Sequence, residues 1–289
     1  MPKRPTPRQR ASHPSSHRRD QKAAAPNLHG DVMAALQTLG VGVTPEVLDA
    51  ALSAAEKESL SHLEFLHRLL AGPVETRLQR ALERRIRAAK FRERTTLEGF
   101  DWEFNAKGVD RRSIEHLMTC DFVRRHENVI MVGQTGLGKS RIIQSIGMAT
   151  CVQGHHVRYA TSAKLLQEFT AALADGTWTR VLAEYARFDL LLIDEFGFER
   201  LEREAEARAS TFYYRLLDAR NGRHSTALVT NVDFTTWDDY LGDATLARAF
   251  VDRLVDGAVI LKLTGRSYRA ARARRLPETN QTDEKSSHR

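Results

Sequence analysis

One eight-residue segment constrains the fold of this chain more than any other. It consists of Gly133, Gln134, Thr135, Gly136, Leu137, Gly138, Lys139 and Ser140. The segment matches the pattern G-x-x-x-x-G-K-[ST], in which glycines let backbone N–H groups turn inward around phosphates and a following helix adds its positive dipole end. In this pattern Lys139 reaches the β- and γ-phosphates and Ser140 contacts Mg²⁺. The segment therefore predicts a phosphate-binding loop at a strand-to-helix corner.

The hydrophobic pattern around this loop predicts the fold class. Apolar runs of strand length occur at residues 129–132, 157–160, 190–193, 227–230 and 259–263. Stretches with helical spacing lie between them, at residues 141–151, 162–173 and 205–220. Apolar runs without polar alternation, joined by helices, are typical of a parallel sheet that is covered on both faces. We therefore expect an α/β fold, with a parallel sheet flanked by helices.

An acidic pair follows the third of these runs. Asp194 and Glu195 come directly after the run that ends at Ile193. A strand there would bring Asp194 beside the Mg²⁺ site and would let Glu195 polarise a water that attacks the γ-phosphate. The structural alternative is an acidic pair that only caps the next helix. Together with the phosphate loop, the pair predicts a metal-binding and a catalytic carboxylate.

Asn231 follows the fourth apolar run in the same way. An uncharged amide at that strand end can form hydrogen bonds with both the attacking water and the γ-phosphate. The alternative is an asparagine that only turns the chain. Because the residue occupies the end of a strand in a phosphate-binding sheet, we expect it to be catalytic.

The positive charge of the chain is concentrated in three segments. The net charge is +7, and residues 1–26 carry seven Lys and Arg against one acidic residue, which is +6. Residues 265–289 carry seven against three, which is +4, and residues 77–94 carry eight against two, which is again +6. Such clusters favour a polyanionic partner, although solvated tails and faces are the alternative. The residues expected to face the polyanion are Arg77, Arg80, Arg84, Arg87 and Lys90.

Changes in pattern along the chain predict its domain organisation. Proline-rich and basic residues at the start cannot bury enough apolar surface to fold, and helical spacing begins near Leu28. In the helical part, Pro45 is expected to open one helix after Thr44, and Gly72-Pro73 to separate two others. The expected parts are a disordered basic arm (1–27), a helical DNA-binding or oligomerisation domain (28–94), a connector (95–128), the sheet domain (129–270) and a polar tail (271–289).

The connector carries alternating aromatic residues, which are Phe100, Trp102 and Phe104. We expect this stretch to be extended and to pack its aromatic side chains onto the sheet domain.

Composition excludes several classes of protein. No apolar run approaches the roughly 20 residues that a membrane-spanning helix needs, and the first residues are polar and basic, unlike a signal peptide. Cys120 and Cys151 are too few for a disulfide framework, which favours a reducing, cytoplasmic setting and buried thiols. We therefore expect no membrane partner.

From about Leu28 to Arg275 the chain resembles the IstB family of AAA+ helper ATPases, which insertion sequences encode and which are related to DnaC-type helicase loaders. Besides the phosphate loop, the segments that carry the resemblance are Thr96 to Asp101, Asp194 to Gly197, Ser225-Thr226, Trp237, Asp252 to Leu254 and Gly265 to Arg269. The resemblance implies a P-loop AAA+ sheet without a full C-terminal lid, preceded by a small all-helical domain. It also implies an ATPase that uses Mg²⁺.

The resemblance further implies how such a chain works with its partners. Members of the family oligomerise on duplex DNA, contribute an arginine across each subunit interface and direct a cognate transposase to a target site. Arg253 matches the position expected for this arginine, and a salt bridge with Asp252 or Asp256 is the alternative for it. Arg266 or Arg269 is expected to reach the nucleotide, with contact to DNA as the alternative for either, and Arg266 is our candidate for the nucleotide site. A DnaC-like helicase loader is the alternative function, because its ATPase core would look nearly the same.

Overall fold

The structure is a computed structural model that describes residues 27–197, 203–233, 237 and 244–273. Most of the predicted basic arm and of the polar tail lies outside this part of the chain, as do the side chains of residues 203–209. The chain divides into two compact units, Met1–Thr76 and Arg77–Arg289. None of the helices in the described ranges is long and apolar enough to cross a membrane.

The first unit is helical. It contains α1 (Leu28–Thr38), α2 (Pro45–Glu58) and the first part of α3 (His62–Ala89). Pro45 opens α2 directly after Thr44, as the sequence predicts, because a proline at the first helical position loses no hydrogen bond. A small cluster of buried side chains holds these helices together, formed by Val43, Leu48, Ala51 and Leu69.

The prediction that Gly72-Pro73 separates two helices is wrong, because α3 continues through both residues. A proline clashes mainly with the N–H and the Cβ of the residue before it, which normally ends a helix there. Gly72 has no Cβ, so this part of the clash with Pro73 is absent. The preceding glycine thus relieves much of the clash, and the helix tolerates the proline.

The second unit is built on a five-stranded sheet in which every pair of neighbouring strands is parallel. The strands are β1 (Val129–Gly133), β2 (Val157–Thr161), β3 (Leu190–Phe196), β4 (Ser225–Thr230) and β5 (Val259–Leu263). Their order in the sheet is β2-β3-β4-β1-β5. All five predicted strands and the α/β fold class are therefore confirmed.

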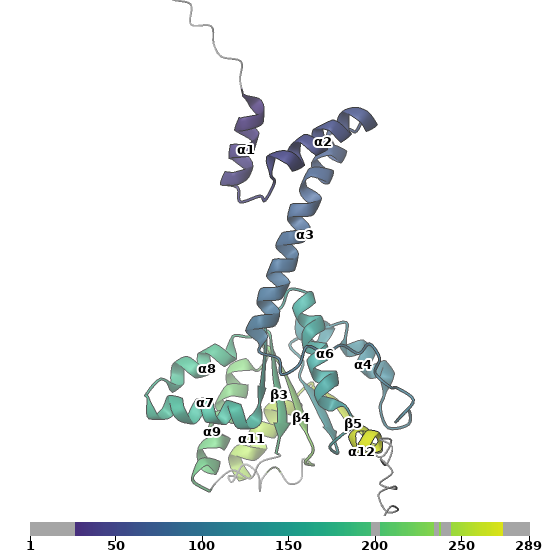
Figure 1. Ribbon diagram of the computed structural model, residues 1–289. Helices are drawn as coiled ribbons and strands as arrows, with labels where there is room; N and C mark the ends of the chain where they lie inside the picture. Colours follow the sequence, from purple (N-terminus) through teal and green to yellow (C-terminus); the bar gives the residue numbers. More distant parts are fainter. Residues whose placement is uncertain (1–26, 198–202, 234–236, 238–243, 274–289) are drawn as a thin grey trace, which may run out of the picture. The chain divides into compact units, whose positions relative to one another are not determined.

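Helices cover both faces of this sheet (Figure 1). One face carries α4 (Arg111–Leu117), α5 (Asp121–Arg124), α6 (Lys139–Val152) and the end of α3. The other carries α7 (Ser162–Ala174), α8 (Trp178–Ala186), α9 (Arg203–Arg220) and α11 (Ala244–Val255). The described chain ends with the short helix α12 (Tyr268–Ala273). The helices at 141–151, 162–173 and 205–220 were predicted, whereas α4, α5, α8, α11 and α12 were not.

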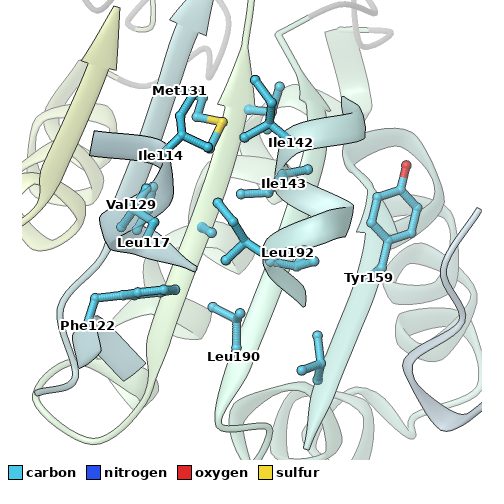
Figure 2. Close-up of a cluster of buried hydrophobic side chains, with 14 of the residues drawn as sticks. Ile114, Leu117, Phe122, Val129, Met131, Ile142, Ile143, Tyr159, Leu190 and Leu192 are labelled. Atoms are coloured by element: carbon cyan, nitrogen blue, oxygen red, sulfur yellow. The ribbon is translucent and has the colours of Figure 1, made fainter. Parts of the chain in front are cut away.

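Aliphatic side chains fill the space between the sheet and the first group of helices (Figure 2). Val129 and Met131 of β1 and Leu192 of β3 meet Ile142 and Ile143 of α6 there. Burial on both faces explains why the central strands β1, β3 and β4 are mostly apolar, whereas the edge strands β2 and β5 include Arg158 and Lys262. Because all five strands run the same way, the loops after them meet at one edge of the sheet, which brings the predicted site residues together.

Cys120 and Cys151 are buried free thiols, as predicted. Burial raises the pKa of Cys151 to about 12, so its thiol stays protonated and unreactive near neutral pH.

Arg220, the last residue of α9, is a buried cation that connects several loops at the opposite edge of the sheet. Its guanidinium donates to the backbone oxygens of Tyr185 (2.8 Å), Ala186 (3.1 Å) and Phe188 (2.9 Å). It also donates to the oxygen of Ser225 and to the hydroxyl of Thr226. Burial lowers the pKa of Arg220 to about 9, so the side chain still carries its charge at pH 7.

We expect Arg220→Met to lower the free energy of unfolding by at least about 3 kcal/mol, because it leaves several buried acceptors without a donor. Urea unfolding of the purified variant measures this loss. The matched control is Arg215→Met, because Arg215 is exposed on the same helix. Equal stabilities of the two variants would contradict a structural role for the buried guanidinium.

Candidate functional site

A cavity of about 470 Å³ lies at the edge where the strands end. This volume is in the range of small-molecule sites. Most of the predicted catalytic and binding residues line it: Thr135, Gly136, Leu137, Gly138, Lys139, Ser140, Asp194, Glu195 and Asn231. Residues from distant parts of the sequence thus converge on one cavity, as expected for the ends of parallel strands.

The phosphate loop takes the conformation that its glycines allow. Gly136 and Gly138 have φ angles of +89° and +86°, which side chains with a Cβ rarely adopt. The loop is also closely packed, because a Cβ on Gly136 would lie 2.1 Å from the Ser267 hydroxyl oxygen and one on Gly138 would lie 2.9 Å from the Phe100 ring. α6 then begins at Lys139, so its N-terminal N–H groups face the cavity.

Lys139 is a largely buried cation whose hydrogen-bond partners are neutral. Its Nζ donates to the backbone oxygens of Gly133 (2.5 Å) and Gln134 (2.8 Å). Burial lowers the pKa of Lys139, whereas the charge of Asp194 raises it. Gly133 and Gln134 are not among the residues that line the cavity, and they contact Lys139 through these carbonyl groups. An anion in the cavity would compensate the lysine charge, which suits a phosphate group.

A local irregularity of β3 separates the roles of the two acidic residues. The pairing of β3 with β4 shifts register between Ile193 and Phe196, and Glu195 has a left-handed φ of +58°. The irregularity leaves Asp194 buried and Glu195 exposed to the cavity. Bulges of this kind redirect side chains next to sites. The two neighbouring carboxylates can therefore do different chemistry.

Asp194 is held by hydrogen bonds from three directions. The Tyr159 hydroxyl donates to its Oδ2 (3.0 Å) and the Glu195 amide to its Oδ1 (2.9 Å). Burial raises the pKa of Asp194, and hydrogen bonds from Ser140, the Glu195 amide and Tyr159 lower it in part. The carboxylate thus has a fixed orientation beside the hydroxyl of Ser140.

Ser140 and Asp194 together fit a magnesium ion. A hydroxyl and a carboxylate are hard oxygen ligands, and Mg²⁺ typically takes one or two such groups and completes its shell with substrate phosphates and water. Within the described part of the chain, no group of three His, Cys, Asp or Glu side chains could hold a metal by itself. The donor set therefore suits a cation that arrives with a phosphate ligand.

Two contacts of the site were not predicted from the sequence: that of Tyr159 with Asp194 and that of Arg92 with Glu195. Tyr159 lies on β2, where the register pairs Thr161 with Asp194, and this brings its hydroxyl to that carboxylate. Its only signal in the sequence is an aromatic hydroxyl in the middle of the predicted strand at residues 157–160. Arg92 Nη1 donates to Glu195 Oε1 at 2.9 Å and lines the cavity, although the sequence places it only in the basic segment.

The connector forms one wall of the cavity. Phe100 and Trp102 pack against the core of the second unit, as the sequence predicts, but the segment forms turns and bends and is not extended. Asn105 binds the turn before α12, because its side chain accepts from the Arg266 amide and donates to the Arg266 carbonyl, both at 3.0 Å. Sequence reasoning missed this amide.

The two candidate arginines near the C-terminal end take different positions. Arg269 lines the cavity and its charge contributes to lowering the pKa of Lys139. Arg266 is not among the lining residues, and its guanidinium lies over the Phe104 ring, 5.3 Å from the centroid. The structure therefore brings Arg269, and not the predicted Arg266, to the site.

Arg253 lies on α11, away from the residues that line the cavity. Its Nε is 3.3 Å from an oxygen of Asp218, and its Nη1 is 3.7 Å from one of Asp252. The predicted alternative of an ion pair with Asp252 is thus present, together with a second acidic partner. Within its own chain Arg253 does not reach the cavity.

The five predicted polyanion-binding residues form an exposed stripe at the end of α3. Arg77, Arg80, Arg84 and Arg87 repeat at intervals of three and four residues, so they share one face of the helix, and Lys90 follows directly after it. We call these five residues the basic stripe. The opposite side of the same helical segment is anchored, because Ile86 and Ala89 are buried in the core of the second unit.

Comparison with known proteins gives consistent matches. The chain matches the model of the family described as IstB-like ATP binding protein over residues 34–276. It is 32% identical over 248 residues to the IS5376 putative ATP-binding protein of Geobacillus stearothermophilus, which covers 85% of this chain and 96% of that protein. It is also 32% identical over 228 residues to the IS21 putative ATP-binding protein of Pseudomonas aeruginosa, with coverages of 79% and 84%.

Solved structures with a similar fold are more distant. DnaI aligns with a TM-score of 0.45 at 17% identity, covering 59% of this chain and 92% of that chain. AMPPCP-bound DnaA from Aquifex aeolicus aligns with a TM-score of 0.49 at 18% identity, with coverages of 62% and 53%.

Proposed function

We propose, since the chain belongs to the family of IstB-like ATP-binding proteins, that it binds ATP with Mg²⁺ in this cavity and hydrolyses it. The observation that carries the proposal is the convergence of Lys139, Asp194, Glu195 and Asn231 on one cavity of about 470 Å³. These residues provide a cation for phosphates, a metal-binding carboxylate, an exposed carboxylate and an amide.

Each of these residues has a separate proposed role in hydrolysis. Lys139 and the N–H groups of the loop would hold the β- and γ-phosphates. Ser140 and Asp194 would hold Mg²⁺, which neutralises charge on the phosphate oxygens. Glu195 would orient and polarise the water that attacks the γ-phosphorus, and Asn231 would fix that water relative to the phosphate. The bond from the γ-phosphorus to the bridging oxygen then breaks, and ADP leaves.

We assign Arg253 to the site of a neighbouring subunit. Its distance from the cavity in its own chain and its half-exposed position on α11 favour this role over one in its own site. A guanidinium from the next subunit would stabilise the charge that develops on the γ-phosphate. The ion pairs with Asp218 and Asp252 would then hold the arginine in place until subunits meet.

The basic stripe supports duplex DNA as the polyanion on which the subunits assemble. Its side chains are exposed, and within the described ranges no acidic side chain forms an ion pair with them, since the nearby Glu83 pairs with Arg94 instead. The names of the two bacterial relatives given above refer to insertion sequences. A cognate transposase is therefore favoured as the protein partner over a replicative helicase, and target-site selection in transposition as the function.

The Lys139→Ala variant tests the nucleotide site. We expect its affinity for a fluorescent ATP analogue to fall at least about tenfold, because a charge-assisted contact with the phosphates is lost. Equilibrium titration in the presence of magnesium measures the change. Lys164→Ala is the matched control, because Lys164 is exposed on α7 and does not line the cavity. Unchanged affinity of Lys139→Ala would refute the site.

A further inference from the structure

The side chain of Asn105 bonds to the backbone of Arg266 in the way that a neighbouring strand would. Its Oδ1 accepts from the Arg266 amide and its Nδ2 donates to the Arg266 carbonyl, both at 3.0 Å. We call this pair of hydrogen bonds the amide clip. Close by, the Gly108 carbonyl accepts from the Thr264 amide at 2.9 Å. The connector thus fixes the chain at the point where it leaves β5.

Two glycines allow the connector and this turn to approach closely. A Cβ on Gly265 would collide with Oδ1 of Asn105, and a Cβ on Gly108 would collide with the carbonyl of Thr264. Gly265 also has a φ of +134°, which residues with a Cβ rarely adopt. The turn at Gly265 and Arg266 is therefore shaped to receive the side chain of Asn105.

The helix α12 begins directly after this turn and is bonded to the phosphate loop. The Tyr268 amide donates to the Gly136 carbonyl of that loop at 3.0 Å. The Phe104 ring, next to Asn105, packs edge-on against the Tyr268 ring, with 5.1 Å between their centroids. A helix of six residues is too short to be stable by itself, so these contacts decide where α12 lies.

Arg269 follows Tyr268 on α12 and lines the cavity together with Lys139. Burial lowers the pKa of Lys139, and the positive charge of Arg269 lowers it further. Two cations in one cavity repel each other, and an anion that binds between them compensates both charges. In the proposed function the phosphates of the nucleotide are this anion.

We propose that Asn105 is a positioning residue for nucleotide binding, because its amide clip holds the turn from which α12 directs Arg269 to the phosphates that Lys139 binds. This inference rests on the proposed ATPase function and adds a residue to the same site. Both the oxygen and the nitrogen of the Asn105 amide bond to Arg266. Asn105 therefore acts through Arg269, and not by a contact of its own with the nucleotide.

The test is a double-variant cycle in which affinity for a fluorescent ATP analogue is measured with magnesium. We expect Arg269→Ala to lower the affinity by at least about tenfold, because a charge-assisted contact with phosphate is lost. Asn105→Ala should lower it by about fivefold, since the arginine then reaches the phosphates only part of the time. The double variant should bind no more weakly than Arg269→Ala, because the clip has nothing left to position.

Gln153→Ala is the matched control. Gln153 is an exposed amide that also joins two parts of the chain, because it donates to the Thr119 carbonyl at 2.9 Å and accepts from Arg124 at 3.4 Å. It does not line the cavity. This variant should keep the wild-type affinity, and thermal unfolding compares its stability with that of Asn105→Ala.

The outcomes separate the positioning role from the function on which it rests. A wild-type chain that binds no ATP analogue would refute the proposed function. If the wild type binds but the losses from Asn105→Ala and Arg269→Ala add up in the double variant, Asn105 acts independently of Arg269 and the positioning role alone is refuted. Unchanged affinity of Asn105→Ala would refute it as well.

Gly265→Ala tests the clip from its other side if Asn105→Ala is unstable. The added Cβ displaces the Asn105 amide without changing that residue. Its loss of affinity should be similar to that expected for Asn105→Ala, and it should disappear when Arg269 is already replaced by alanine. A loss that persists in the Arg269→Ala background would overturn the proposal.

Discussion

Glu195→Gln should lower the rate of ATP hydrolysis by at least about 100-fold and leave the affinity for ATP nearly unchanged. The amide keeps the size of the side chain but cannot accept a proton or polarise water as a carboxylate does. Because we propose that Asp194 and the phosphate loop hold the nucleotide without Glu195, binding should persist. Phosphate release with saturating duplex DNA and equilibrium titration with an ATP analogue measure the two quantities.

The control for this variant is Glu115→Gln, which neutralises an exposed carboxylate that pairs with Arg111 and does not line the cavity. It should hydrolyse ATP at the wild-type rate. Parallel loss of binding and hydrolysis in Glu195→Gln would mean that the residue has a structural role, and normal hydrolysis would mean that another group activates the water.

Mixing the variants extends the experiment to Arg253. Arg253→Ala chains retain Glu195 but lack the arginine that we assign to a neighbouring site, whereas Glu195→Gln chains have the opposite defect. Some subunit contacts in an equimolar mixture then contain both intact groups, so hydrolysis should recover in part. A mixture no more active than its components would argue against an arginine that acts between subunits.

Reversing three charges of the basic stripe should weaken duplex DNA binding strongly. For Arg80→Glu, Arg84→Glu and Arg87→Glu combined, we expect a loss of at least about 100-fold in affinity and a reduction of about 3 in the salt slope. The reason is that each cation on a phosphate releases a counterion. Binding isotherms at several salt concentrations give both values.

The matched control variant changes the net charge by the same amount as the stripe variant, but on the face of the sheet that carries α7 and α8. Lys164→Glu, Arg180→Glu and Arg187→Glu replace three exposed cations on or next to α7 and α8. This triple variant should keep most of the affinity and of the salt slope. Equal losses in both triple variants would show that overall charge, and not the stripe, attracts the DNA.

The sheet and the residues at the ends of its strands could be predicted from the sequence, because Asp194 and Asn231 directly follow apolar runs and Lys139 belongs to the loop that follows the first run. Lys139, Asp194 and Asn231 needed no knowledge of long-range contacts, since parallel strands bring their ends together. The contact between Arg92 and Glu195 joins residues 103 positions apart, and no local pattern indicates it.

Two other differences between the sequence-based predictions and the structure have local physical causes. Gly72 removes the part of the steric clash before proline that involves a Cβ, so the expectation that a helix ends before a proline fails there. The choice between Arg266 and Arg269 depends on a turn that the Asn105 side chain holds through two hydrogen bonds. That turn leaves Arg266 over an aromatic ring and brings Arg269 to the cavity.

The most direct test of this account is phosphate release by the purified wild-type chain with ATP and magnesium, measured without and with duplex DNA. The account predicts hydrolysis that duplex DNA accelerates and that Lys139→Ala abolishes in both conditions. Absence of hydrolysis in both conditions, or a rate that Lys139→Ala leaves unchanged, would contradict it.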